Sequence, residues 1–142
     1  MIGLKLYVNI DGGSRGNPGQ AASAMVIADE TGRVLATKSK YLGDGVTNNY
    51  AEWSALAGAV KALLHLAGQY GPIEAEVRSD SKLVVQQFRR EWKMKDADLS
   101  EIARGVWGDL AQNKDLSIKV RHVPRTENKL ADAAVNRELD RR

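Results

Sequence analysis

Apolar and polar residues alternate with a period of two along the N-terminal part of the chain, which predicts strands before any helix. The predicted strands cover Leu4–Asp11, Ala21–Ala28 and Arg33–Lys40. Asp29-Glu30-Thr31-Gly32 separates the second strand from the third as a hairpin-like turn, and Gly12–Gly19 reads as a glycine-rich turn segment. Because the connections are short, we expect the three strands to form an antiparallel meander.

From residue 49 onward the apolar residues fall at helical spacing, and strands and helices then follow one another. Asn49–Ala67 is predicted as a long helix, which Gly68 and then Gly71-Pro72 should end. The remaining predicted elements are a strand, two helices, a strand and a closing helix, at Ile73–Arg78, Ser81–Arg90, Asp98–Gln112, Leu116–His122 and Glu127–Arg141. The order βββαβααβα indicates an α/β fold with a mixed five-stranded sheet and helices on both faces.

The composition is typical of one globular domain without a membrane segment. A chain of 142 residues can build a single core and carries no repeat or linker, so we expect one domain over residues 1–142. No apolar run approaches the roughly 18 residues of a membrane span, and we expect a cytoplasmic monomer. Cysteine is absent, which excludes disulfides and thiolate metal sites. The 21 Lys and Arg against 18 Asp and Glu give a net charge of +3, which weakly indicates a polyanionic partner.

Four acidic residues stand out because they lie at junctions between elements or beside apolar stripes. Asp11 ends the first strand, Asp80 follows the fourth strand, and Asp132 lies in the closing helix. Glu52, in the first turn of the long helix, falls within about 40° of the stripe that should face the core. If these carboxylates converge, they need a cation or raised pKa values, and an all-oxygen ligand set suits Mg²⁺ or Mn²⁺.

Each carboxylate also has a structural interpretation. Glu52 could complete a capping box with Asn49, and Asp80 could cap the helix that follows it. Asp11 could be an ordinary turn acid, and Asp132 an exposed helix residue. The patterns alone do not show that the four side chains converge.

Four motifs, taken in order along the chain, resemble those of type 1 ribonuclease H. They are Asn9–Gly19, Thr47–Glu52, Ser79-Asp80-Ser81 and Asn128–Asp132. Together with the order βββαβααβα they span the chain from residue 4 nearly to its C-terminus. The resemblance implies a ribonuclease H-like fold. It also implies an endonuclease that cuts the RNA strand of an RNA/DNA hybrid and leaves 5′-phosphate and 3′-hydroxyl ends.

The same resemblance implies two Mg²⁺ ions, replaceable by Mn²⁺, that are held by Asp11, Glu52, Asp80 and Asp132, with Asp11 bridging both. Two ions about 3.5–4 Å apart can hold an attacking water and the leaving 3′ oxygen in line. The RNA strand would be read in its minor groove, partly through 2′-hydroxyls. The implied contacts are Ser14, Gly16, Asn17 and Asn48 for the RNA, and Thr47 and Asn49 for a DNA phosphate.

Positive charge gathers between residues 78 and 95, which carry six basic and two acidic residues. Lys82, Arg89 and Lys93 would fall along one line if the second helix continued. This predicts phosphate contacts, Lys82 among them, although a solvated helix face explains the pattern nearly as well. The chain passes from Phe88 to Asp98 without room for the basic insertion of some family members, so hybrid affinity should be modest and salt-sensitive.

The loop before the closing helix is where some family members place an assisting histidine. His65 lies within the long helix as a packing or surface residue, and His122 lies in the final turn of the last strand. Arg125 is the better candidate for assisting catalysis. Its guanidinium stays protonated, so it could contact phosphate but could not shuttle a proton.

Other functions fit parts of the sequence. A non-catalytic nucleic-acid-binding module of the same fold is the main alternative, but such a module would have no reason to keep all four acids. A nucleotide phosphotransferase would need a second domain, and a transposase or junction-resolving nuclease fits Thr47-Asn48-Asn49 and Ser14–Asn17 poorly. Double-stranded RNA is a second candidate substrate, because family members without the basic insertion and the loop histidine can be broader in substrate.

Overall fold

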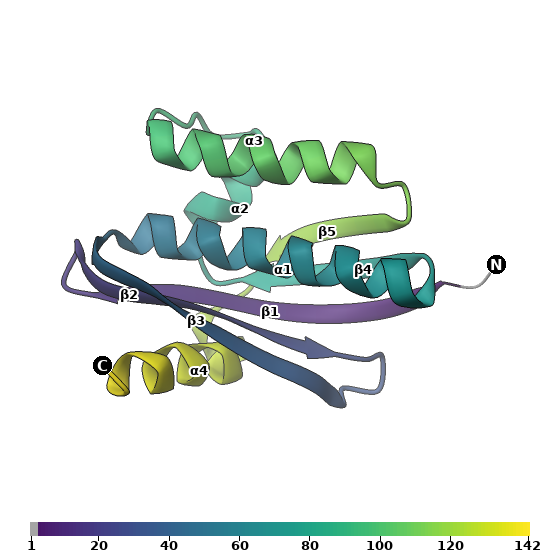
Figure 1. Ribbon diagram of the computed structural model, residues 1–142, viewed down its shortest axis with the longest axis horizontal. Helices are drawn as coiled ribbons and strands as arrows, with labels where there is room; N and C mark the ends of the chain where they lie inside the picture. The colour runs from purple at the N-terminus through teal and green to yellow at the C-terminus, as the bar shows by residue number, and fades with distance from the viewer. Residues whose placement is uncertain (1–2) are drawn as a thin grey trace.

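Five strands form one mixed sheet in the order β3-β2-β1-β4-β5 (Figure 1). The computed structural model describes residues 3–142, with strands β1 (Leu4–Arg15), β2 (Gly19–Ala28), β3 (Val34–Val46), β4 (Ile73–Ser79) and β5 (Leu116–His122). β1 is the central strand, because it pairs antiparallel with β2 and parallel with β4. β2 pairs antiparallel with β3, and β4 pairs parallel with β5. The predicted meander, mixed sheet and element order are confirmed.

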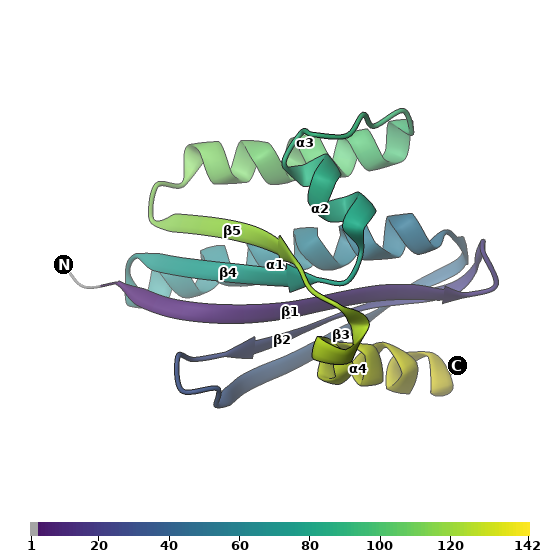
Figure 2. The same cartoon turned by 180° about the vertical axis from the view of Figure 1, so that it is seen from behind.

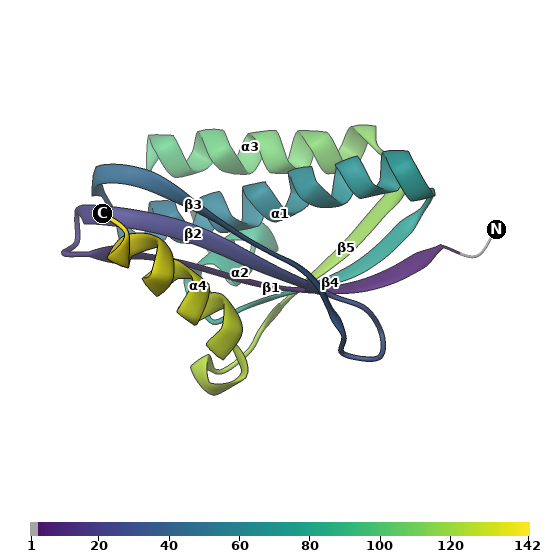
Figure 3. The same cartoon turned by 60° about the horizontal axis from the view of Figure 1, so that its bottom comes forward.

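The helices lie on both faces of this sheet, as predicted. α1 (Asn48–Tyr70), α2 (Lys82–Phe88) and α3 (Ala97–Gln112) lie on one face, and α4 (Lys129–Asp140) lies on the other (Figure 3). A short 3₁₀ turn, Arg125–Glu127, joins β5 to α4. α4 covers only one end of its face (Figure 2). In the described part of the chain, no helix is both long and apolar enough to cross a membrane.

The main core lies between α1 and the sheet. Trp53, Leu56 and Leu63 of α1 are fully buried against a sheet surface that includes Val8 and Ile10. The alternation of β1 sends these two side chains toward α1 and their neighbours toward the α4 face. Burial of each large aliphatic side chain stabilises the fold by roughly 1.5–3 kcal/mol, so the central strand is held firmly where it approaches α1.

α4 packs on the opposite face over small side chains of β2. A polar contact also ties its C-terminal turn to the edge strand. Glu138 accepts hydrogen bonds from the Arg142 guanidinium at 2.7 Å and from the Ser39 hydroxyl at 2.9 Å. These donors hold the pKa of Glu138 below its ordinary value. Arg142 in turn lies over the ring of Tyr41, 4.2 Å from its centroid.

Several predicted boundaries are wrong, among them the end of the third strand, which runs on to Val46 instead of ending at Lys40. The glycine-rich segment after Asp11 is mostly strand rather than turn, because Gly12–Ser14 pair with β2. The long helix passes through Gly68 and ends before Gly71, which has φ of 90° and donates its N–H to Ala67. The closing helix begins two residues later than predicted, because the 3₁₀ turn precedes it.

The second predicted helix is also shorter than its pattern suggested. α2 ends at Phe88, so the expected alignment of Lys82, Arg89 and Lys93 on one helical line is wrong. The Arg89 guanidinium instead donates to the Val120 carbonyl at 2.7 Å. No helix lies between α2 and α3 among the described residues, in agreement with the predicted lack of a basic insertion.

Candidate active site

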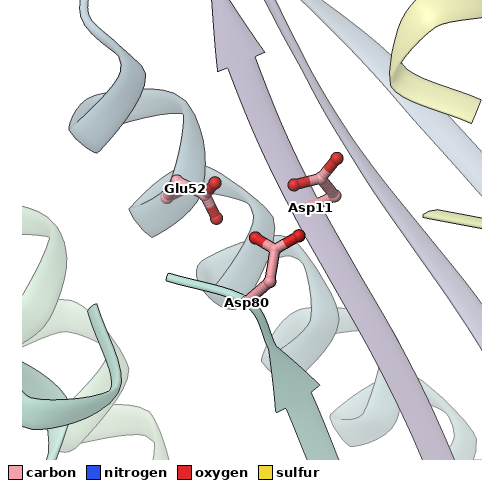
Figure 4. A group of neighbouring side chains, drawn as sticks. All are labelled: Asp11, Glu52 and Asp80. Atoms are coloured by element: carbon pink, nitrogen blue, oxygen red, sulfur yellow. The ribbon is translucent and has the colours of Figure 1, made fainter. Parts of the chain in front are cut away.

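Three of the four predicted carboxylates meet where the central strand passes the start of α1 (Figure 4). Asp11 lies on β1, Glu52 on α1, and Asp80 directly after β4. One carboxylate oxygen from each residue lies within 4.8 Å of the other two. In the parallel register of β1 and β4, Ile10 pairs with Ser79, so the two aspartates that follow them are neighbours.

Gly12 allows α1 to approach the central strand closely enough for Glu52 to reach Asp11. A Cβ atom at Gly12 would lie 2.3 Å from the carbonyl oxygen of Ala51 and 2.5 Å from the backbone nitrogen of Glu52. Such contacts are too short for any other residue type. The glycine after the first aspartate is therefore a requirement of helix-to-strand packing.

The structural roles considered for Glu52 and Asp80 are wrong, because other residues cap the helices. Thr47 caps α1 by accepting a hydrogen bond from the Tyr50 N–H at 3.2 Å. Ser81 caps α2 in the same way. Glu52 is the fifth residue of α1, beyond its first turn. Neither carboxylate is needed to satisfy a helix end.

Asp132 completes the acidic surface of a cleft of about 370 Å³ that also contains the three clustered carboxylates. It lies in the first turn of α4, on the far side of the cleft from α1. Asp132 is not within the tight group of three oxygens. Its proximity nevertheless raises the pKa of Asp11, so Asp132 affects the protonation of the cluster.

Burial and mutual repulsion strongly favour the neutral forms of the two innermost acids. Burial, followed by the charges of Asp80 and Asp132, raises the pKa of Asp11 to about 7. Burial, followed by the charges of Asp11 and Asp80, raises the pKa of Glu52 to about 9. These side chains are only 6% and 9% exposed. A nearby cation would reverse both shifts.

The donor set fits a divalent metal ion. Glu52 Oε2 is buried and has no hydrogen-bond partner among residues 3–142, and such an orphaned acceptor is costly. All the charged groups of the cluster are carboxylates, which are the ligands that Mg²⁺ and Mn²⁺ prefer. The cluster therefore provides an unsatisfied oxygen and three carboxyl groups whose ionised forms a bound cation would stabilise.

The residues predicted to contact RNA form a connected polar rim beside the carboxylates. The backbone N–H of Ser14 donates to Asn48 Oδ1 at 2.8 Å, and the N–H of Asn48 donates to Asn17 Oδ1 at 3.1 Å. The Ser14 hydroxyl donates to the carbonyl of Gly16. These bonds join the β1–β2 turn to the start of α1, and Ser14 and Asn48 line the cleft.

The two residues predicted to hold a DNA phosphate lie outside this cleft. Thr47 and Asn49 are both exposed near the start of α1. Thr47 borders a second hollow of about 580 Å³, between the starts of α1 and α3. Asp96, Asp98 and Glu101 also line that hollow, and their charge opposes phosphate binding there.

Arg125 lies in the cleft and His122 does not. Arg125, in the 3₁₀ turn, lines the cleft, and its positive charge lowers the pKa of Glu52 against the larger effect of burial. His122 is exposed at the end of β5. His65 is exposed on α1. The geometry favours the arginine over either histidine as a neighbour of the carboxylates.

The basic segment of residues 78–95 offers fewer unpaired cationic side chains than its composition indicates. Arg89 is bonded to β5, and the Arg90 guanidinium lies 4.1 Å from the ring centroid of Trp107. Lys82 begins α2 just after Asp80, and its Nζ lies 5.8 Å from the ring centroid of Trp92. Trp92 is 44% exposed, so this pair presents a cationic and aromatic surface near the cleft.

Two asparagines of the first and fourth motifs have contacts that sequence analysis did not assign. Asn128 is 1% exposed, and its Nδ2 donates to the Ile10 carbonyl at 2.8 Å and to Asp80 Oδ2 at 3.4 Å. Its Oδ1 accepts a hydrogen bond from Asn9 Nδ2 at 3.0 Å. In the sequence, the one indication of these contacts was an asparagine directly before the closing helix. An ordinary helix N-cap gives the same pattern, so it did not point to the contacts with Asp80 and β1.

Comparison with known proteins places this geometry in a family. A family model described as "Reverse transcriptase-like" matches residues 9–138. A ribonuclease HI of Halobacterium salinarum is 38% identical over 138 residues, which cover 97% of this chain and 66% of that protein. A bifunctional protein of Mycobacterium tuberculosis is 34% identical over 96% of this chain. The chain spans 66% and 36%, respectively, of the lengths of these two relatives.

Solved structures agree in fold over nearly the whole chain. LC11-RNase H1, in complex with an RNA/DNA hybrid, is 36% identical with a TM-score of 0.86, and the match covers 93% of this chain and 94% of that one. RNase H1 from Halobacterium salinarum is 37% identical with a TM-score of 0.83, and the match covers 97% of this chain and 99% of that one. With the acidic cluster in the order and setting described above, these matches show that the chain belongs to the type 1 ribonuclease H family.

Proposed function

We propose that this protein hydrolyses the RNA strand of RNA/DNA hybrids, using divalent metal ions, and leaves 5′-phosphate and 3′-hydroxyl ends. The observation that carries the proposal is the convergence of Asp11, Glu52 and Asp80 within 4.8 Å, beside a rim of polar groups. A relative of similar fold was crystallised with an RNA/DNA hybrid, which supports the same substrate for this chain.

Asp11, Glu52 and Asp80 would hold the ions, with Asp132 supplying a further carboxylate from α4. Mg²⁺ is the proposed ion, and Mn²⁺ shares its preference for oxygen ligands. When bound, two such ions activate the attacking water and stabilise the leaving 3′ oxygen. Because Asp11 and Glu52 have raised pKa values in the metal-free protein, both must lose protons before they can act as ligands.

The polar rim supports recognition of the RNA strand. Ser14, Asn17 and Asn48 are fixed by hydrogen bonds to one another, so they would meet the minor groove in a preset arrangement. A 2′-hydroxyl both donates and accepts hydrogen bonds, and it distinguishes RNA from DNA at this rim. Gly16 has φ of 85°, which lets the turn between β1 and β2 reverse beside the cleft without strain.

Cationic side chains around the cleft would contact the phosphate backbones. Arg125 lines the cleft, so its proposed role is electrostatic contact of its guanidinium with a phosphate near the carboxylates. Lys82, whose Nζ lies over the ring of Trp92, would contact the backbone of the hybrid's second nucleic-acid strand beyond the cleft. Thr47 and Asn49 would contact a phosphate from the exposed start of α1, on the side away from the acidic hollow that Thr47 borders.

The test is strand-specific cleavage. Each strand of an RNA/DNA hybrid, a double-stranded RNA and a double-stranded DNA is labelled separately and incubated with Mg²⁺, Mn²⁺ or chelator. We expect cuts in the RNA of the hybrid with either metal and none with chelator. Cleavage of double-stranded RNA as well would broaden the substrate class. Metal-independent binding without any cleavage would refute the proposal and favour a non-catalytic binding module.

A further inference from the structure

Asn128 is buried next to the acidic cleft and makes hydrogen bonds to residues that form it or adjoin it. Its Nδ2 group donates to Asp80 Oδ2 at 3.4 Å and to the carbonyl of Ile10, the residue before the central carboxylate, at 2.8 Å. Its backbone carbonyl accepts the N–H of Asp132 at 3.1 Å, and its own N–H donates to the Arg125 carbonyl at 3.0 Å. One residue thus connects β1, the end of β4 and the start of α4.

The side chain of Asn128 does not cap α4, although its position predicts that it would. Asn128 is the N-cap residue of α4, and asparagine at an N-cap ordinarily accepts a hydrogen bond from a backbone N–H of the first turn. Here the side chain makes no such bond. It turns instead into the protein, where it is 1% exposed, so its burial serves the contacts with β1 and Asp80.

Asn9 determines which end of the Asn128 amide faces Asp80. Asn9 Nδ2 donates both to Asn128 Oδ1, at 3.0 Å, and to the Glu127 carbonyl, at 3.1 Å. If the Asn128 amide were reversed, its oxygen would face a carboxylate and a carbonyl, while its NH₂ group would face another NH₂ group. All three partners therefore select the orientation that presents a donor to Asp80.

We propose that Asn128 is a positioning residue for the metal-binding carboxylates, and that Asn9 fixes its orientation. The inference rests on the proposed function of the cleft. A carboxylate that lies among other carboxylates is repelled by them, and a hydrogen bond from a buried donor to Oδ2 restrains the Asp80 side chain within the cluster. Partners of this kind typically change metal affinity or activity by about 10–100-fold.

The experiment compares Asn128→Ala and Asn9→Ala with Gln87→Ala as a matched control. Gln87 is also a buried amide, 6% exposed, and it is bonded to Trp53 and to the Lys93 carbonyl but to no carboxylate of the cleft. Binding of Mg²⁺ to each protein alone is measured by calorimetry, together with the thermal midpoint. The Mg²⁺ concentration for half-maximal hybrid cleavage and KM for the hybrid are measured in parallel.

We expect Asn128→Ala to bind Mg²⁺ about 10–100-fold more weakly and Asn9→Ala to show a smaller loss. Both variants should need correspondingly more Mg²⁺ for cleavage at an unchanged KM. Gln87→Ala should lose thermal stability but bind Mg²⁺ like the wild type. Should Asn128→Ala not fold, Asn9→Ala still tests the inference, because it leaves Asn128 in place.

The inference is overturned if the folded Asn128→Ala, or Asn9→Ala in its stead, binds Mg²⁺ as tightly as the wild type. Loss of stability without loss of Mg²⁺ affinity would assign the asparagines a purely structural role. Failure of the proposed function gives a different result, since the wild-type protein itself would then neither bind Mg²⁺ nor cut the hybrid.

Discussion

Replacing Asp11 by asparagine removes a buried carboxylate whose ionised form destabilises the fold of the metal-free protein. Asp11 is 6% exposed, and burial together with the charges of Asp80 and Asp132 raises its pKa to about 7. Above that pH the ionised carboxylate opposes folding unless a cation is bound. We therefore expect Asp11→Asn to stabilise the metal-free protein and, at the same time, to reduce hybrid cleavage to near zero.

The size of the effect follows from the pKa. A value of about 7 in place of 3.8 corresponds to about 4 kcal/mol of penalty on the ionised form. Rearrangement of the neighbouring carboxylates and entry of water reduce this penalty. We therefore expect Asp11→Asn to raise the free energy of unfolding by roughly 1–3 kcal/mol above pH 8. For a domain of this length that is a rise of about 2–10 °C in the thermal midpoint.

The sign of the pH dependence is specific. Because the pKa of Asp11 is higher in the folded state than in the unfolded chain, the stabilisation from its protonation is complete below about pH 4 and is lost as the pH rises through about 7. The stability difference between Asp11→Asn and the wild type should therefore be small near pH 4 and largest above pH 8.

The assay is thermal unfolding in chelator across this pH range, repeated with saturating Mg²⁺. Mg²⁺ stabilises only the protein that binds it, which is the wild type. It should therefore reduce or reverse the difference in thermal midpoint between Asp11→Asn and the wild type. Asp115→Asn, in the exposed turn between α3 and β5, removes the same charge from the surface and should show no comparable pH-dependent gain. An Asp11→Asn protein that is less stable than the wild type at pH 9 in chelator would show that the buried carboxylate does not destabilise the fold, and cleavage at the wild-type rate would exclude Asp11 from catalysis.

Four further predictions concern single side chains. Gly12→Ala should lose roughly 1–3 kcal/mol of stability and most cleavage, because its Cβ would lie 2.3 Å from a carbonyl of α1; unfolding and activity measurements check this. Glu138→Gln should lower the thermal midpoint at neutral pH, and its difference from the wild type should shrink on acidification, since the depressed pKa of Glu138 stabilises the fold above the ordinary glutamate range and that stabilisation is lost as the pH falls. Arg125→Ala should reduce kcat/KM more than His122→Ala, and the opposite ranking would contradict the placement of the arginine in the cleft. Hybrid affinity should fall as salt rises from about 50 to about 200 mM, and Lys82→Ala should reduce the steepness of that fall by about one phosphate contact.

The sequence pattern located every helix and strand, because most of them bury one face and show the corresponding period; β3, which has no buried residue, was located only in its first part. Its errors have two causes: strand pairing between distant segments in one place, and local backbone conformation in another. Gly12–Ser14 look like turn residues, yet they continue β1 because β2 offers paired backbone groups. Gly68 looks like a helix end, yet the chain there is exposed and helical, and Gly71 with φ of 90° ends α1 instead.

The acidic residues of the site could be named from their motifs, but their environment could not. Sequence spacing gives no measure of the burial that raises the pKa values of Asp11 and Glu52. The cap assigned to Asn49 and Glu52 is made by Thr47, which a local pattern cannot distinguish among three neighbouring polar residues. The contact of Asn128 with Asp80 joins residues far apart in the sequence, so only the folded structure reveals it.

We propose above all that the clustered carboxylates form a metal-dependent site that cuts the RNA strand of a hybrid, and this proposal has a direct test. Its most direct test is cleavage of an end-labelled RNA strand, paired with DNA, by the wild type and by Asp80→Asn, with Mg²⁺ and with chelator. We expect the wild type to cleave the RNA with Mg²⁺ and not with chelator, and a folded Asp80→Asn protein to cleave almost none. Equal cleavage by the two proteins, or cleavage that persists in chelator, would contradict it.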